Sequence, residues 1–272
     1  MNFKTFAGIL LCFLLFISSF LLSGNAGVYF NLTALLVVFS GTAGAALLSS
    51  GLGRMKDALF LARQAYSREN GSATLLIAEI LRVSLFIRKK GYLHPSDRKK
   101  VRNPILASGL ELLEDNFDPE EIEQALSSEM RMLAWRRERI ENVFRNMASF
   151  APSFGVAGSV IGLIGLLTGL GDTALILKNI PVALVSTLYG VVLANFFLTP
   201  IAERIQDDTQ TQILSREIVL EGMISISAGT EFHKLNCKLN MLVRPEERIE
   251  DRTLIRKIKS SVFSVKSAPA ST

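Results

Sequence analysis

The sequence has few of the residue types that build catalytic or metal sites. It contains two cysteines, Cys12 and Cys237, and two histidines, His94 and His233, all far apart along the chain. Cys12 lies in the first long apolar run and Cys237 in the charged C-terminal part, so the two cannot form a disulfide framework. No group of cysteine, histidine or acidic residues has the spacing of metal ligands. A phosphate-binding glycine loop and a nucleophile beside a general base are also missing. We therefore expect neither an enzyme nor a protein that holds a metal or a cofactor.

Charge is absent from three long stretches, residues 5–53, 146–171 and 179–202. With 49% hydrophobic residues and a mean hydropathy of +0.33, the chain is too apolar for an ordinary soluble domain. A helix crosses a bilayer core of ~30 Å with about 20 apolar residues. The first stretch is long enough for two spans, broken at residues 23–27 and at Asn31, and the others hold one each. The sequence predicts an all-α polytopic membrane protein with a helical cytoplasmic domain and four transmembrane helices, at about Phe6–Leu22, Leu32–Ser50, Ala151–Leu170 and Ile180–Pro200.

The first apolar run also fits a signal peptide, because Lys4 precedes it. However, Ser18, Ser19 and Phe20 offer no clear small-x-small cleavage site, and a second span follows within ten residues. We therefore favour a retained helix.

The basic residues predict how the chain is oriented. Of the 30 lysines and arginines, 17 lie between Arg54 and Arg145 and 11 between Arg204 and Lys266. Basic residues are enriched on the cytoplasmic side of membrane proteins. We therefore expect a membrane protein whose termini and main domain are cytoplasmic and whose two hairpin loops face outward. This topology explains the net charge of +5, which is then no argument for nucleic acid.

The sequence predicts four segments along the chain. Residues 1–52 hold transmembrane helices 1 and 2, residues 53–149 form the cytoplasmic helical domain, and residues 150–202 hold transmembrane helices 3 and 4. Residues 203–272 form cytoplasmic C-terminal helices and a disordered tail. The helix after Pro200 should continue through about Ile226, and a turn and a short helix should follow within residues 229–248.

Two segments of the middle domain carry clear helix signals. In residues 73–88, Leu76, Ile80, Val83 and Ile87 recur at helical spacing. In DNFDPEEIEQAL, Asp118 can cap a helix whose first turn holds a proline and two glutamates. Because neither proline nor glycine follows before residue 151, one long helix should run from there into the third span.

Small residues recur in the third and fourth spans at positions that share one helix face. Small side chains at this spacing let helix backbones approach closely. We therefore expect these two spans to face other helices, through Gly155, Gly158, Gly162, Gly190 and Ala194.

Hydroxyl groups also occur in these apolar spans, at Ser159, Ser186 and Thr187. In one interpretation each bonds to the carbonyl four residues back and has no other role. In the other they line an ion's path, since hydroxyl oxygens coordinate dehydrating cations and hold water chains. No ionisable residue lies inside the spans, so either no ion crosses or another chain supplies the acid. Helical rise puts Thr187 ~20 Å from Pro200 and Ser159 ~10 Å from Pro152, which predicts two stations at different depths.

Five ordered segments resemble the MotA branch of the MotA/TolQ/ExbB family, which are ring-forming subunits of bacterial flagellar stators. They are NLTALLVVFSGTAGAALLSS, NPILASGLELLEDNFDPEEIEQAL, APSFGVAGSVIGLIGLL, VALVSTLYGVVLANFFLTPIAER and EGMISISAGTEFHKLNCKL. The resemblance implies a pentameric ring around two copies of a MotB-like single-span subunit that carries the essential aspartate. It also implies that each passing ion protonates or occupies that aspartate, and that the ring turns about the partner dimer to drive flagellar rotation in chemotaxis.

The resemblance implies roles for particular residues. Pro152 and Pro200 match the family's two functional prolines, although by themselves they could also begin, end or kink a helix. Thr187 matches a channel-facing threonine, next to Ser186. Ser159 falls where sodium-type members usually have threonine and proton-type members often have alanine. The transported ion therefore stays open between H+ and Na+, with the hydroxyl slightly favouring sodium.

The expected contact with a FliG-like rotor protein is only half present. Family members use a cytoplasmic arginine and a glutamate for it. Arg88, Lys89 and Lys90 supply the cationic half, whereas Ser96 stands at the glutamate position and Asp97 follows it. The basic run could instead anchor the helix near membrane lipid headgroups. A flagellar stator, a non-flagellar energiser of envelope transport or gliding, and a non-conducting membrane scaffold therefore all remain open.

Overall fold

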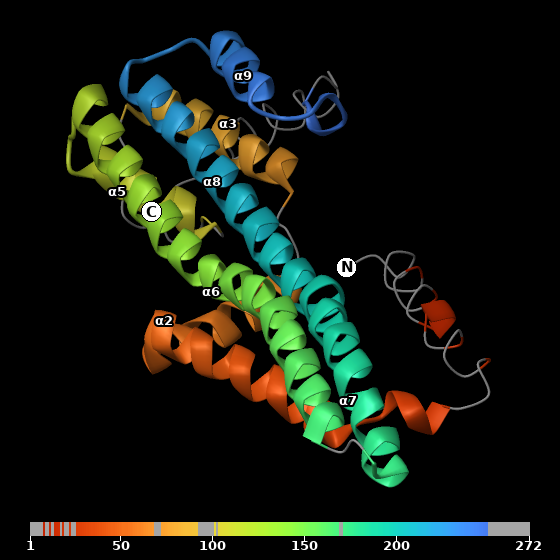
Figure 1. Cartoon of the computed structure of the whole chain (residues 1–272). Coiled ribbons are helices and arrows are strands. Elements are labelled where there is room, and N and C mark those ends of the chain that lie inside the picture. The colour runs from red at the N-terminus through yellow and green to blue at the C-terminus, as the bar shows by residue number, and fades with distance from the viewer. Residues whose placement is uncertain are drawn as a thin grey trace, which may run out of the picture. The chain divides into compact units, whose positions relative to one another are not determined.

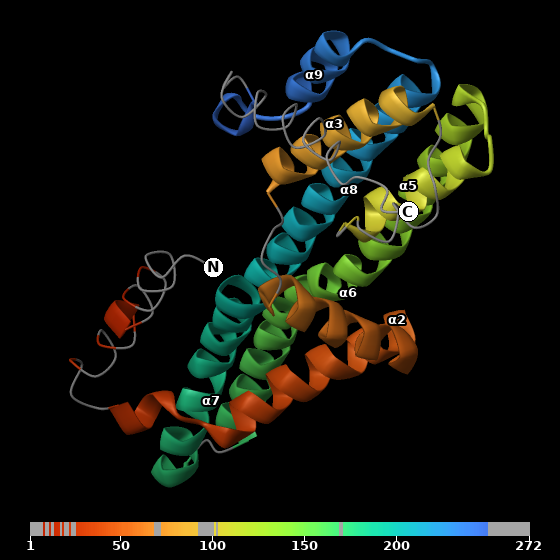
Figure 2. The same ribbon diagram turned by 180° about the vertical axis from the view of Figure 1, so that it is seen from behind.

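The computed structural model is all helical over the residues that it describes (Figures 1 and 2). These are residues 26–67, 72–91, 101, 103–168 and 171–249, with residues 8, 11, 14–16, 18 and 22 of the N-terminal segment. The predicted all-α class is confirmed for them. In chain order the elements are η1 (Ala26–Tyr29), α2 (Leu32–Ser67), α3 (Ala73–Lys90), α5 (Pro104–Glu114), α6 (Pro119–Thr168), α7 (Thr173–Val192), the π-helix η2 (Leu193–Leu198), α8 (Thr199–Ser227), α9 (Phe232–Met241) and η3 (Pro245–Glu247).

Three helical runs in the described part of the chain are long and apolar enough to cross a membrane. They are Leu32–Ser67, Pro119–Thr168 and Thr173–Ser227. They contain the predicted second and fourth spans and the predicted third span up to Thr168. The predicted first span, Phe6–Leu22, lies largely outside the described residues, as do Cys12, His94 and the C-terminal tail.

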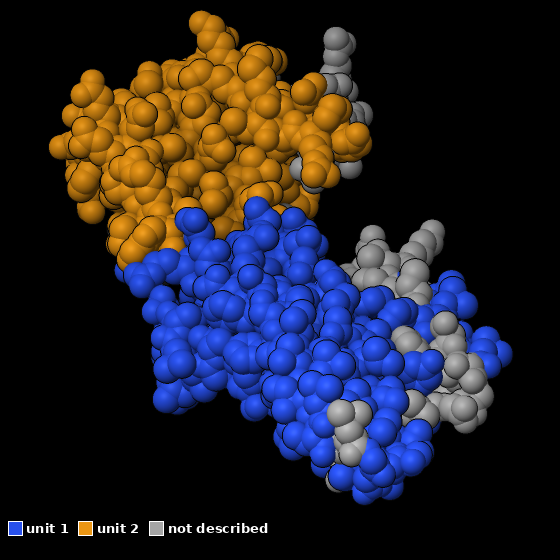
Figure 3. Space-filling view, in the orientation of Figure 1, with its two compact units in different colours: residues 1–69, 136–207 blue, residues 70–135, 208–272 orange. Residues whose placement is uncertain are grey.

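The chain forms two compact units, which Figure 3 colours blue and orange. Unit 1 comprises residues 1–69 and 136–207, and unit 2 comprises residues 70–135 and 208–272. Each unit therefore combines two stretches that are far apart in the sequence, and α6 and α8 contribute residues to both.

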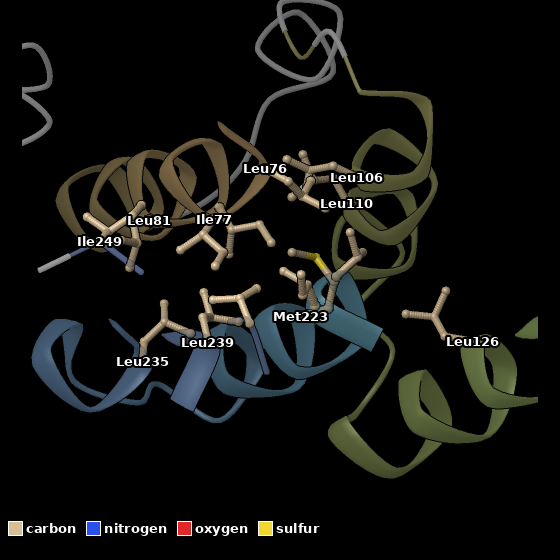
Figure 4. Packing of buried hydrophobic residues seen from close by; sticks show 14 of the residues in the cluster. Leu76, Ile77, Leu81, Leu106, Leu110, Leu126, Met223, Leu235, Leu239 and Ile249 are labelled. Carbon is tan, nitrogen blue, oxygen red and sulfur yellow. The ribbon is translucent and has the colours of Figure 1, made fainter. Parts of the chain in front are cut away.

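Unit 2 is held together by a core of aliphatic side chains (Figure 4). Ile77 and Leu81 of α3, Leu106 of α5, Met223 of α8 and Leu235 of α9 are fully buried in it. Burying one such side chain contributes about 1.5–3 kcal/mol. The predicted helices over residues 73–88 and 229–248 are confirmed by α3 and α9, whose apolar faces fill this core.

Unit 1 has a second core, built by residues of α2, α6 and α8. Ala58 and Leu61 of α2 pack there with Phe144 of α6 and Ile205 of α8. The segment of α2 that carries them is separated from the predicted span by a kink at Gly51, where φ is 75° and ψ is 159°. Residues with a Cβ rarely adopt this conformation, so glycine is required for the change of direction.

The start of α6 is fixed by reciprocal hydrogen bonds. The Glu121 amide donates to Asp118 Oδ1 over 2.9 Å, and the Asp118 amide donates to Glu121 Oε2 over 3.0 Å. This capping box satisfies two donors that the first helical turn leaves open. The predicted helix start is therefore confirmed, and the helix continues without interruption into the third span.

Neither of the two singled-out prolines ends a helix. Pro152 lies inside α6, and Pro200 lies in the first turn of α8, which follows the fourth span and η2 without a break. A proline ring clashes with the carbonyl four residues earlier, which for Pro200 is the carbonyl of Phe196. The wider π-helical turn at Leu193–Leu198 contains this residue, so it provides the room that the ring needs.

Candidate functional site

The candidate site is a group of oxygen atoms between α6 and α7. Ser159 Oγ lies 2.6 Å from Thr187 Oγ1, 2.5 Å from the Ala183 carbonyl oxygen and 3.2 Å from the Gly155 carbonyl oxygen. A serine hydroxyl has one hydrogen, and both carbonyls only accept, so it cannot donate to every neighbour at once. This oxygen group therefore has more lone pairs than hydrogens, which is a favourable setting for a small cation.

The direct contact between Ser159 and Thr187 contradicts the prediction of two stations at different depths. That prediction measured each residue from the nearest proline and treated Pro152 and Pro200 as level. In the structure Gly190, and not Pro200, lies beside Pro152: a methyl group at Gly190 would be 3.1 Å from Pro152 Cα. With this offset between antiparallel helices, the two hydroxyls meet.

Close approach of the two helices depends on the predicted small residues. A methyl group at Gly162 would lie 2.5 Å from the backbone nitrogen of Ala183, and one at Gly155 would lie 3.0 Å from the Ser186 carbonyl oxygen. Gly190 meets the Ala151 carbonyl in the same way, and Ala194 is buried. Since backbone atoms cannot move aside as a flexible side chain can, the oxygen group exists because these positions carry almost no side chain.

Ser186 is separate from the oxygen group. Its side chain is fully buried against Gly158, and its hydroxyl donates to the Val182 carbonyl over 2.6 Å, four residues back in α7. This bond uses its single hydrogen locally. The structure therefore brings Ser159 and Thr187 together and places Ser186 at the helix contact.

No charged side chain is recorded as a partner of the oxygen group in the described part of the chain. Asp172 is engaged at the start of α7, where its side chain accepts from the Ala174 and Leu175 amides. Thr187 is exposed and Ser159 is half-buried, so the group opens onto the surface of this chain. An acid that serves it would have to approach from outside.

The three predicted rotor-contact residues that the structure describes lie in the last turn of α3. All are exposed, and Arg88 donates to the Gly229 carbonyl over 3.1 Å, while Lys90 Nζ lies 4.5 Å from the centre of the Phe86 ring. Positive charge at a helix C-terminus is favourable, so Arg88, Lys89 and Lys90 also stabilise α3. Asp97 lies outside the described residues.

Two polar residues of the fourth span were missed by sequence reasoning. Tyr189 donates to the Tyr29 carbonyl over 2.6 Å and accepts from the Asn31 amide over 3.2 Å, so it fixes the start of α2. Asn195 lies in η2 and donates to the Val191 carbonyl over 3.0 Å. It is the only amide side chain between residues 180 and 202, and that rarity was a signal present in the sequence.

A sequence model of the MotA/TolQ/ExbB proton channel family matches residues 97–218. The chain is 29% identical over 243 residues to the Bacillus subtilis protein YtxD, described as uncharacterized, covering 88% of this chain and 89% of that protein. It is 28% identical over 229 residues to the chemotaxis protein PomA of Vibrio alginolyticus, covering 84% and 90%.

Two solved structures have the same fold. The C. jejuni MotAB structure matches with a TM-score of 0.82 at 20% identity, over 93% of this chain and 98% of that one. The flagellar MotAB stator complex of Bacillus subtilis matches with a TM-score of 0.82 at 24% identity, over 90% and 97%.

Proposed function

We propose that this chain, which belongs to the MotA/TolQ/ExbB proton channel family, is the ring-forming subunit of an ion-driven rotary stator unit. The family is one of channels and stators and not of enzymes, which agrees with the absence of catalytic motifs from the sequence. The observation that carries the proposal is the oxygen group at Ser159 and Thr187. It lies at the surface of two closely packed apolar helices, where a passing cation can exchange water for protein oxygens.

The missing acid is supplied by a second protein in this proposal. Ion-driven pumps and transporters use ionisable groups at membrane depth, and the predicted spans of this chain contain no acidic or basic side chain. A MotB-like single-span subunit that carries an aspartate would provide it. The related solved structures are of MotAB complexes, which supports a two-component assembly. The ring would contain five copies of this chain around a partner dimer.

Torque would come from the change in charge of that aspartate. The ionised acid is attracted to the hydroxyls of the oxygen group, and an acid neutralised by a cation is not held in the same way. Each ion therefore changes which ring position the partner prefers, and successive ions turn the ring about the partner. In this proposal the chain lies in the bacterial inner membrane with four spans, and both termini and the main domain are in the cytoplasm.

We take Na+ as the driving ion. Hydroxyl and carbonyl oxygens are the ligands that hard cations prefer, and two carbonyls beside two hydroxyls give Na+ a partial replacement for its hydration shell. In the H+ alternative the proton would be carried by the partner's aspartate, and Ser159 would matter little.

The driven partner in this proposal is a flagellar rotor resembling FliG, contacted through Arg88, Lys89, Lys90 and Asp97. A non-flagellar energiser of envelope transport or gliding is the second candidate, because Ser96 stands where the resemblance calls for a glutamate. Membrane lipid headgroups are further partners of the basic residues.

The test replaces Ser159 by alanine in a strain that expresses the chain with its single-span partner. Because Ser159→Ala removes one of the cation's oxygens, sodium-dependent motility or transport should fall, and the sodium concentration for half-maximal output should rise. Unchanged sodium dependence would reject the role of Ser159.

A non-conducting scaffold, by contrast, should tolerate both Ser159→Ala and Thr187→Val. A deletion strain that still swims would assign the chain to work other than flagellar rotation.

A further inference from the structure

Asn195 carries an amide on the same exposed stripe of the fourth span as Thr187. Thr187, Val191 and Asn195 follow one another at intervals of four and are all exposed, with Val191 at 44%. The buried stripe of the same span, which includes Gly190 and Ala194, faces α6. Asn195 is therefore not part of the α6–α7 contact, and its polarity needs another explanation.

The orientation of this amide is fixed by its one hydrogen bond. The Val191 carbonyl can only accept, so Asn195 must present its nitrogen to it, and Oδ1 is turned away. In the described part of the chain this is the only hydrogen bond recorded for the side chain. Transferring an amide from water to an apolar environment without compensating hydrogen bonds costs about 2–7 kcal/mol of free energy.

The π-helix gives Asn195 a second free oxygen. In an α-helix its carbonyl would accept from the Thr199 amide, but that amide donates to the Ala194 carbonyl, five residues back. In a continued π-helix the donor would be residue 200, which is a proline and has no N–H. The backbone carbonyl and Oδ1 of Asn195 are thus both acceptors without a helical donor. Carbonyls released where a membrane helix departs from α-geometry are known ligands for Na+.

We propose that Asn195 is a second cation station, on the cytoplasmic side of the Ser159–Thr187 oxygen group. Eight residues separate Thr187 from Asn195, or ~12 Å along the helix, which is too far for one ion to touch both. Na+ that leaves the first group would be held by Oδ1 and the backbone carbonyl of Asn195 before release. This inference rests on the proposed function, because it takes Na+ as the ion that crosses.

The test measures uptake of radioactive sodium by membrane vesicles that contain the chain together with its single-span partner. Asn195→Leu has nearly the same size and no polar atoms, whereas Asn195→Gln keeps the amide. Phe197→Leu is the matched control, since Phe197 lies in the same π-helix, exposed, and carries no oxygen on its side chain. Phe196 is less suitable because its ring packs against Phe16, with centroids 4.8 Å apart.

Asn195→Leu should lower the maximal uptake rate about tenfold, as expected for the loss of one charge-assisted oxygen contact, while the half-saturating external sodium concentration changes less than twofold. The maximal rate falls while the half-saturating concentration stays nearly constant, because Na+ still enters at Ser159 and Thr187 and only its passage by Asn195 is slowed. Asn195→Gln should restore much of the rate, and Phe197→Leu should leave it unchanged. The amount of partner that co-purifies should be equal in all variants.

Several results would overturn the inference. An unchanged maximal rate in Asn195→Leu would show that no station exists, and an equal loss in Phe197→Leu would assign the effect to the shape of the π-helix. Failure of Asn195→Gln to restore uptake, or loss of the partner from Asn195→Leu, would make the amide an assembly contact. If Thr187→Val lowers sodium uptake and Asn195→Leu does not, only the second station is rejected. If the unaltered complex takes up no sodium, the proposed driving ion fails and this inference fails with it.

Discussion

Replacing Gly190 by alanine should separate the third and fourth spans. The added methyl group would lie 2.5 Å from the Ala151 carbonyl oxygen and 3.1 Å from the Cα atoms of Gly155 and Pro152. Ordinary van der Waals contact begins at 3.4 Å, so the helices must move apart by up to about 0.9 Å, the difference between 3.4 Å and 2.5 Å. All the obstructing atoms belong to the backbone, and none can rotate away.

The energetic cost follows from this displacement. A gap of about 0.5–1 Å forfeits a quarter to a half of the dispersion energy of each atom pair across the contact. Overpacked sites typically lose about 1–3 kcal/mol, and the higher helix propensity of alanine returns at most about 1 kcal/mol. We therefore expect Gly190→Ala to lower the free energy of unfolding by about 2 kcal/mol.

The assay is reversible unfolding of the purified chain in mixed micelles with increasing denaturing detergent. Gly44→Ala is the matched control, because Gly44 also lies in an apolar helix but has no atom within 4 Å of the added methyl group. That control should be neutral or stabilised by up to about 1 kcal/mol. Equal unfolding free energies for Gly190→Ala and Gly44→Ala would refute the close packing of α6 on α7.

Other features of the fold make separate predictions. Gly51→Ala should cost about 1–3 kcal/mol, because φ 75° and ψ 159° are strained for any residue with a Cβ, and an unchanged unfolding midpoint would contradict the kink. Asp118→Ala should cost about 0.5–2 kcal/mol in the same assay by removing the cap of α6, and no loss of stability would mean that the capping box is dispensable. Tyr189→Phe should cost about 0.5–1.5 kcal/mol and speed hydrogen exchange at the Asn31 amide, and exchange at the original rate would rule out that hydrogen bond.

Local signals in the sequence predicted the helices well. The start of α6 was predictable because Asp118 and Glu121 lie three residues apart and bond to each other's backbone. The α3 helix was predictable because apolar residues recur at helical spacing and meet one core. In both cases the determining interactions are close in sequence or repeat with the helix period.

The offset between α6 and α7 could not be predicted in the same way. The offset depends on which glycine of one helix packs against which backbone group of the other, such as Gly190 against the Ala151 carbonyl. The sequence of either helix alone does not determine these pairings. Helical rise measures distances along a single helix. The conclusion that Ser159 and Thr187 lie at different depths was wrong because Pro152 and Pro200 do not lie opposite each other. The hydroxyl contact between Ser159 and Thr187 is a consequence of that offset.

Departures from regular helix were also hidden from sequence patterns. Pro200 indicated that the regular helix is interrupted near this position. Whether the result is a kink, a helix end or a π-helix depends on whether the surrounding packing keeps the helix continuous. Tyr189 and Asn31 are 158 residues apart, so their hydrogen bond required the tertiary fold. Asn195 was visible as a single amide, yet its free oxygens follow only from the π-helix around it.

The central claim is that this chain conducts cations only together with a second protein that contributes an acid. Sodium current should be measured across vesicles that contain the purified chain alone, and across vesicles that contain it with its single-span partner. We expect current only in the second preparation, and its loss when the partner's membrane aspartate is changed to asparagine. A robust sodium current carried by the chain alone would contradict the account.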